Sequence, residues 1–154
     1  MRRFFNCLAV AALFAGFAAL SSCHDDNDLP DVDIALDVEE GTVVDGMIYV
    51  VQGDDIKIGG IKVTNADPCK NAAVTNVAYY WDGLFYAPAP LAPYPMTFST
   101  SETTPAGKHT IGVRCSVLAV DKELAEGLYT FPVRVVEDED DIPDGTETTT
   151  VHAD

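Results

Sequence analysis

Short runs in which apolar and polar residues alternate fill most of the chain after its N-terminal segment. A period of two places every second side chain on one face, which is typical of strands that pack on a core. Glycine, proline and Asp-Gly pairs separate the runs, and no run keeps the 3.6-residue period of a helix. The pattern predicts strands at 34–38, 47–51, 55–64, 74–81, 96–98, 109–117 and 128–136, and residues 84–86 can add a further short strand.

Two interruptions of this pattern add detail. The apolar phase of residues 55–64 slips by one position at Gly59-Gly60, which predicts a β-bulge. Residues 88–95 contain four prolines, and proline has no amide donor for a central strand, so we expect a stiff loop at the edge of the domain. About seven short strands joined by turns predict an all-β sandwich.

Three segments carry a family resemblance: residues 77–83 (VAYYWDG), the pair Pro93-Tyr94, and residues 105–111 (PAGKHTI). Together they resemble a bacterial extracellular immunoglobulin-like module, and the resemblance covers residues 34–136. It implies an immunoglobulin-like β-sandwich of about seven strands. The chain departs from the antibody type, which has a tyrosine two residues before the second core cysteine, because that position is Val113 here.

The N-terminus has the layout of a secretory signal. Arg2 and Arg3 precede an apolar run from Phe4 to Leu20, and small residues follow. A transmembrane helix is the alternative, but 17 residues lie at the short limit for spanning a bilayer, and no basic cluster follows the run. We therefore interpret residues 1–22 as a signal peptide that is removed.

The end of that signal, Leu20-Ser21-Ser22-Cys23, resembles the lipobox of bacterial lipoproteins. The resemblance implies cleavage before Cys23 and attachment of lipid to its sulfur, so that acyl chains hold the protein on the membrane. The acid-rich run His24-Asp25-Asp26-Asn27-Asp28 resembles a signal that Bacteroidetes-type lipoproteins use for display on the cell surface. A solvated spacer is the alternative. The expected location is the outer membrane, lipid-anchored and exposed on the cell surface.

Negative charge is concentrated at the two ends of the expected mature chain. The net charge is −16, and residues 23–40 and 137–154 hold eight acids each without lysine or arginine. Acidic ends repel phosphate, so we expect no nucleic-acid partner. We divide the chain into a signal peptide (1–22), an acidic tether (23–33), a β-sandwich (34–136) and an acidic tail (137–154) that we expect to be disordered.

Candidate catalytic and metal-binding residues are sparse. His109 is the domain's single histidine, no G-x-S-x-G motif occurs, and the acidic runs lack the pattern of a calcium loop. We interpret His109 as a half-exposed strand residue that caps a turn. We therefore expect no enzyme activity, no metal and no cofactor.

Two cysteines remain in the expected domain, Cys69 in a polar loop and Cys115 within a strand. An oxidising compartment permits a disulfide between them, provided that the loop folds back onto the sheet. Two thiols, buried or free, are the alternative.

Aromatic residues crowd into residues 79–94, and they are the best candidates for a functional role. Tyr79 and Trp81 lie at alternate positions after Val77, so we expect their side chains to face the core with that of Val77. Four others lie on the opposite face or near the proline-rich loop: Tyr80, Phe85, Tyr86 and Tyr94. Exposed, rigid rings suit the recognition of a glycan or protein ligand, whereas the alternative is that they cap the open end of the sandwich.

These observations predict a cell-surface, lipid-anchored binding or adhesion module without catalytic activity. The alternative is a structural accessory subunit of an outer-membrane glycan-uptake or fimbrial assembly.

Overall fold

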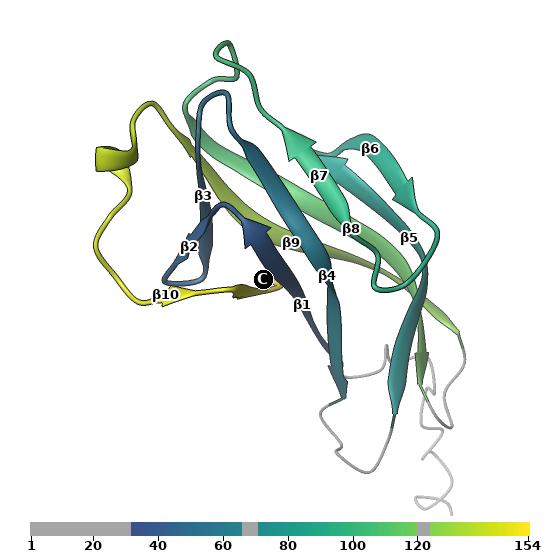
Figure 1. Ribbon diagram of the computed structural model, residues 1–154. Helices are drawn as coiled ribbons and strands as arrows, with labels where there is room; N and C mark the ends of the chain where they lie inside the picture. The colour runs from purple at the N-terminus through teal and green to yellow at the C-terminus, as the bar shows by residue number, and fades with distance from the viewer. Residues whose placement is uncertain (1–31, 66–70, 120–123) are drawn as a thin grey trace, which may run out of the picture.

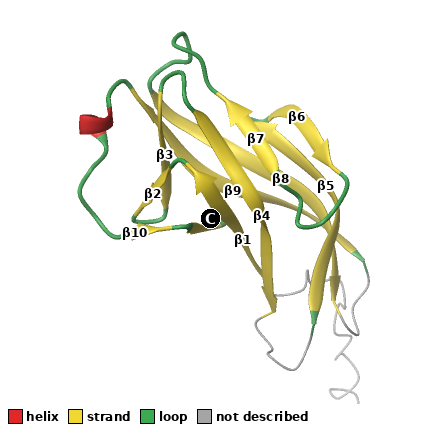
Figure 2. Cartoon of the chain, viewed as in Figure 1, coloured by secondary structure: helices red, strands yellow, loops and turns green. Residues whose placement is uncertain are grey.

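A computed structural model describes residues 32–65, 71–119 and 124–154. These residues form two β-sheets that pack face to face as a sandwich (Figure 1; Figure 2). The predicted all-β, immunoglobulin-like β-sandwich is confirmed, although the described residues form more strands than the seven or so predicted. The strands are β1 (Val32–Glu40), β2 (Thr42–Val44), β3 (Met47–Val51), β4 (Asp55–Asn65), β5 (Ala72–Trp81), β6 (Leu84–Ala89), β7 (Met96–Ser99), β8 (Gly107–Ala119), β9 (Ala125–Val136), β10 (Glu147–Thr148) and β11 (Thr150–His152).

The order of strands defines two contrasting edges of the sandwich. The small sheet has the order β11-β1-β4-β7, and the large sheet has the order β10-β2-β3-β9-β8-β5-β6. Neighbouring strands are antiparallel, except that β3 runs parallel to β9. One side of the sandwich is therefore bounded by β10 and β11, and the other by β6 and β7.

The predicted strands correspond to observed ones, and the predicted bulge is present. Asp37 pairs with Gly60 and Val38 pairs with Ile58, so the register skips Gly59. A side chain at Gly59 would collide with Glu39. Because Gly59 has no side chain, the in-out alternation of β4 can shift by one residue at this point. Ile58 before it and Ile61 after it both still pack on the core.

The core lies between the two sheets and is built from inward-facing residues of both. The largest fully buried side chains are Tyr79, Phe98, Phe131, Ile34, Leu36, Ile48, Ile56, Ile58 and Ile111. Burial of alternate residues along each strand is the physical basis of the period of two in the sequence.

The prediction of a disordered tail at residues 137–154 is wrong. A 3₁₀ turn forms at Glu139–Asp141, β10 pairs with β2, and β11 pairs with β1. Val151 is fully buried in the core. The sandwich therefore extends to the C-terminus, beyond the predicted boundary at residue 136.

Residues 147–154, here called the C-terminal clasp, hold the two sheets together. Besides the two strand pairings, the amide of Ala153 donates to the carbonyl of Ile34 in the small sheet at 2.9 Å. The amide of Asp154 donates to the carbonyl of Thr130 in the large sheet at 3.0 Å. The clasp closes the side of the sandwich opposite β6 and β7.

The expected signal peptide, most of the acidic tether with Cys23, and the loop residue Cys69 lie outside the described residues. Within the described ranges, no helix has the length and apolar character needed to cross a membrane.

Candidate functional site

The side of the sandwich between β6 and β7 carries an open hollow of about 280 Å³. We call it the aromatic hollow. It is lined by Trp81, Leu84, Phe85, Tyr86 and Phe98 and by the hydroxyl residues Ser99, Thr100 and Thr104. None of these lining residues carries a charge. The hollow is therefore a neutral site with apolar walls and a few hydroxyl groups, a composition that is typical of small-ligand pockets.

A tight turn between β5 and β6 places the apolar side chains at this edge. Asp82 and Gly83 both have positive φ, 49° and 77°, as a two-residue hairpin turn of type I′ requires. The turn brings Leu84, Phe85 and Tyr86 to the open edge, where they are 74%, 61% and 41% exposed. Such exposure of three consecutive large apolar residues marks this turn as a candidate contact surface.

The rings of the aromatic hollow rest on one another, and this contact fixes their positions. Phe98 of β7 is buried and forms the floor. The ring centroid of Tyr86 lies 4.7 Å from that of Phe98, and the ring centroid of Trp81 lies 5.7 Å from it. Packing of this kind restricts the rotamers of Tyr86 and Trp81, so little entropy is left to lose on binding a ligand.

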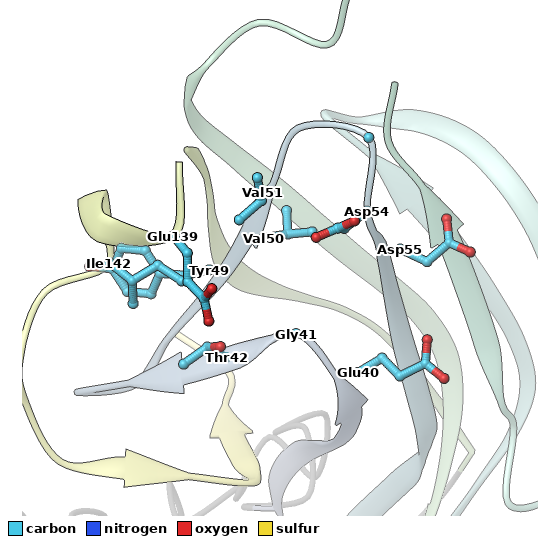
Figure 3. A pocket seen from close by; sticks show the side chains of 11 residues that line it. Glu40, Gly41, Thr42, Tyr49, Val50, Val51, Asp54, Asp55, Glu139 and Ile142 are labelled. Carbon is cyan, nitrogen blue, oxygen red and sulfur yellow. The ribbon is translucent and has the colours of Figure 1, made fainter. Parts of the chain in front are cut away.

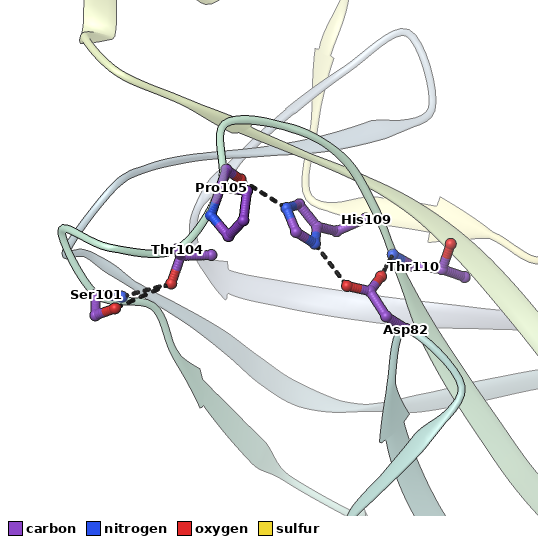
Figure 4. A network of polar contacts seen from close by, with 6 residues as sticks. All are labelled: Asp82, Ser101, Thr104, Pro105, His109 and Thr110. Carbon is purple, nitrogen blue, oxygen red and sulfur yellow. Dashed lines mark hydrogen bonds and ion pairs between the residues drawn. The ribbon is translucent and has the colours of Figure 1, made fainter.

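His109 contacts Trp81, which lines the aromatic hollow. It also belongs to a polar network (Figure 4). Its Nδ1 is 2.7 Å from Oδ2 of Asp82, and its Nε2 is 2.7 Å from the carbonyl oxygen of Pro105. The other oxygen of Asp82 accepts the amide of Thr110 at 2.9 Å. The imidazole also stacks on Trp81, with centroids 5.2 Å apart. His109 thus joins the β5–β6 turn to the loop before β8.

Burial lowers the pKa of His109, but the hydrogen bond to Pro105 and the bond and charge of Asp82 outweigh it, so the pKa is raised above 6.5. Only 9% of the His109 side chain is exposed, less than the half-exposed residue that the sequence predicts. Both ring nitrogens are occupied by hydrogen-bond partners, which leaves neither free to act as a general base.

The structure brings two of the four predicted ligand residues, Phe85 and Tyr86, into the aromatic hollow. Tyr80 lies beside it, on the outer face of the large sheet, with its ring in an edge contact with Phe85. There it borders a second hollow of about 380 Å³ whose other lining residues include Gly112, Arg114 and Leu128.

Tyr94 has a different, structural place. Its hydroxyl donates to the carbonyl of Val74 at 2.7 Å, and its own carbonyl accepts the hydroxyl of Tyr79 at 2.8 Å. Tyr94 packs against the core from the proline-rich loop, between the ends of β6 and β7. Its ring therefore seals part of the open side and does not belong to the aromatic hollow.

Sequence reasoning missed Phe98 and the His109–Asp82 pair as parts of the site. The Asp-Gly turn signal fixes the position of Asp82, and the alternation of residues 109–117 fixes His109 at a strand start. Nothing in the pattern, however, indicates that β7 of one sheet faces β6 of the other. That arrangement is set by the packing of the two sheets.

A third hollow, of about 550 Å³, lies beside β3 and contains several acids (Figure 3). Its carboxylates do not converge, because Glu139 lies next to Tyr49 whereas Glu40 and Asp55 lie on the other side (Figure 3). Among the described residues, no group of three or more metal-ligating side chains is close enough to hold a metal ion.

Cys115 is a buried thiol that faces the core. Burial raises the pKa of Cys115 to about 11, so its reactive thiolate form is scarce at neutral pH. The predicted disulfide stays a prediction, because Cys69 lies outside the described residues.

Comparisons of the chain with known proteins give matches among solved structures alone. No family model matches the chain, and no curated protein matches it. Among the solved structures that match are fibronectin(III)-like modules of CbhA from Clostridium thermocellum. This match is 17% identical, has a TM-score of 0.40, and covers 66% of this chain and 94% of the other.

Proposed function

We propose that this protein is a binding module without catalytic activity, carried on the outer membrane by lipid on Cys23, and that it binds a neutral glycan in the aromatic hollow. The observation that carries the proposal is the exposure of Leu84, Phe85 and Tyr86 beside a hollow with aromatic walls. Large apolar side chains exposed together are unfavourable in water, and a ligand that covers them removes that cost.

The rigidity of the aromatic hollow supports a binding role. Tyr86 and Trp81 are braced on the buried ring of Phe98. Contact surfaces of this kind bind with little loss of side-chain entropy, because their rings are already ordered in the free protein.

The chemistry of the lining favours a glycan over a charged ligand. A sugar ring has an apolar C–H face that stacks on aromatic rings and a rim of hydroxyls that form hydrogen bonds. The hollow offers both kinds of partner, with aromatic walls and the hydroxyl residues Ser99, Thr100 and Thr104. Because no lining residue is charged, a neutral sugar matches it better than a phosphorylated or acidic one.

The test is binding of the purified protein to an array of neutral glycans, followed by titration of the best binder. Phe85→Ala removes an exposed ring, and Tyr86→Ala removes a wall of the hollow. We expect each to weaken binding by roughly tenfold, or about 1.4 kcal/mol, as is usual for central aromatic contacts. Leu118→Ala is the matched control, because Leu118 is an exposed apolar residue of β8 outside the hollow.

Circular dichroism and thermal unfolding show whether each variant keeps its fold. Folded Phe85→Ala and Tyr86→Ala variants that retain full affinity would overturn the site. Absence of binding to every neutral glycan, together with binding of a protein in the same hollow, would replace the proposed ligand class.

A further inference from the structure

His109 contacts three separate parts of the aromatic hollow's surroundings. Its Nδ1 faces Asp82 of the β5–β6 turn and its Nε2 faces the carbonyl of Pro105 (Figure 4). Its ring lies on Trp81. Trp81 is itself a wall of the hollow, and Thr104, next to Pro105, lines it too. One imidazole ring therefore contacts Trp81 directly and reaches the neighbour of Thr104 through Pro105, so a change at His109 acts on both walls.

The two hydrogen bonds require two protons. A carbonyl oxygen only accepts hydrogen bonds, so Nε2 must carry a proton to bond Pro105. The carboxylate of Asp82 also accepts, so Nδ1 must carry a proton as well. A neutral imidazole has a single N–H, and it therefore loses one of the two contacts. The described geometry is that of the imidazolium form.

The stacking of the His109 ring on Trp81 also favours the imidazolium form. A cation over the face of an indole ring is attracted by its π electrons, whereas a neutral imidazole is attracted less. Loss of the proton thus weakens the hold of His109 on Trp81 as well as on Pro105 or Asp82.

Asp82 is the charged group that faces His109 among the described residues. On β9 the residue paired with His109 is the apolar Val133. Glu102 of the preceding loop lies near Gly53, and Lys108 precedes His109 on β8 with an exposed side chain. The charge balance at the ring is therefore set mainly by Asp82.

We propose that His109 is a proton-operated latch: its imidazolium form holds Trp81 and the loop at Pro105 in the shape that binds ligand, and its deprotonation loosens both. The latch regulates the site proposed above and rests on that function for its effect on ligand affinity. Glycan binding would then weaken as pH rises.

The sign of the stability effect follows from the raised pKa of His109. A group whose pKa is higher in the folded than in the unfolded state stabilises the fold below the unfolded value of about 6.5. This contribution is lost as pH rises from there through the folded-state pKa. We expect Trp81 and the loop at Pro105 to loosen over the same pH range.

The chain contains one tryptophan, so its fluorescence reports on the hollow alone. We would titrate the purified protein with pH, following tryptophan intensity and its quenching by acrylamide, a small neutral probe. Contact with a protonated imidazole quenches indole fluorescence. We expect intensity and acrylamide access to rise together in one transition above pH 6.5 as the latch opens.

His109→Gln should abolish this transition. His152→Gln is the matched control, because His152 also pairs with an aspartate, Asp33, at 2.8 Å but lies far from Trp81 in the clasp. The pH transition in the fluorescence of the His152→Gln variant should be the same as in the original protein. NMR of the imidazole protons gives the pKa of His109 directly.

A transition that persists in His109→Gln, or constant acrylamide access while NMR shows His109 titrating, would overturn the latch. This experiment needs no ligand, and the glycan titration of the Phe85→Ala variant is made at one fixed pH. Failure of the latch and failure of the binding function are therefore separate results.

Discussion

Tyrosines of this chain have very different roles although the sequence places them close together. Tyr79 is fully buried, Tyr86 is exposed at the aromatic hollow, and Tyr94 seals the gap beside it. The difference lies in the neighbours of each ring. Tyr94 follows Pro93 in a loop that returns to the core, it has a φ of 68°, and its ring packs against the core.

Loss of the Tyr94 hydroxyl should destabilise the fold. Tyr94→Phe leaves the carbonyl of Val74 without its 2.7 Å partner, at a cost of about 1 kcal/mol. Urea unfolding should show a lower midpoint with an unchanged slope. Tyr86→Phe is the comparison, because the hydroxyl of Tyr86 makes only a long 3.4 Å contact with the amide of Ser99. Equal stability of both variants would contradict the role of Tyr94.

At the scale of elements, the C-terminal clasp adds a second link between the two sheets on the side where β1 already continues into β2. Its short strands pair with one sheet each, and Val151 inserts into the core between them. The clasp belongs to the folded domain, and its loss affects both sheets together.

Val151→Ala should therefore lower the free energy of unfolding by about 2 kcal/mol, since it removes two buried methyl groups and leaves a cavity. Thr149→Ala, at an exposed position between β10 and β11, should stay within about 0.5 kcal/mol of the original protein. Urea unfolding at a single pH measures both. A neutral effect at Val151 would mean that the clasp does not contribute to the core.

The sequence predicts elements better where burial repeats along the chain. Residues 109–117 and 128–136 alternate over many positions, and both form the expected strands. The clasp has one buried residue in a three-residue strand, too short for a period to appear among acids and threonines. Two of the four predicted ligand residues, Phe85 and Tyr86, line the aromatic hollow. Phe98 joins them from the other sheet, and no pattern within one strand indicates that strands of two sheets will face each other.

At the scale of the whole molecule, the aromatic hollow and the start of the N-terminal strand lie at opposite ends. β1 begins at the lower end beside the end of β4, whereas β5 runs to the upper end and turns there into β6 (Figure 1). Ten residues of β5 span about 30 Å. If lipid on Cys23 holds the lower end, the hollow faces away from the membrane.

Attachment to the membrane through Cys23 and exposure on the cell surface can be tested in the same cells. Cys23→Ser should move the protein from the membrane fraction to the soluble fraction, because the acyl chains that hold it are lost. Protease added to intact cells should digest the original protein while a periplasmic control survives. A Cys23→Ser variant that stays in the membrane fraction would contradict the anchor, and protection of the original protein would contradict surface display.

The separation of tether and hollow also determines how the module responds to tension. If lipid on Cys23 anchors the chain, a ligand that pulls on the β5–β6 turn while the anchor holds the start of β1 draws the two ends of the sandwich apart along the strands. β1 is flanked by β4 on one side and β11 on the other, so the load is carried in shear by its hydrogen bonds. Bonds loaded in shear must break together rather than one after another, and the C-terminal clasp thus reinforces the strand that bears the force.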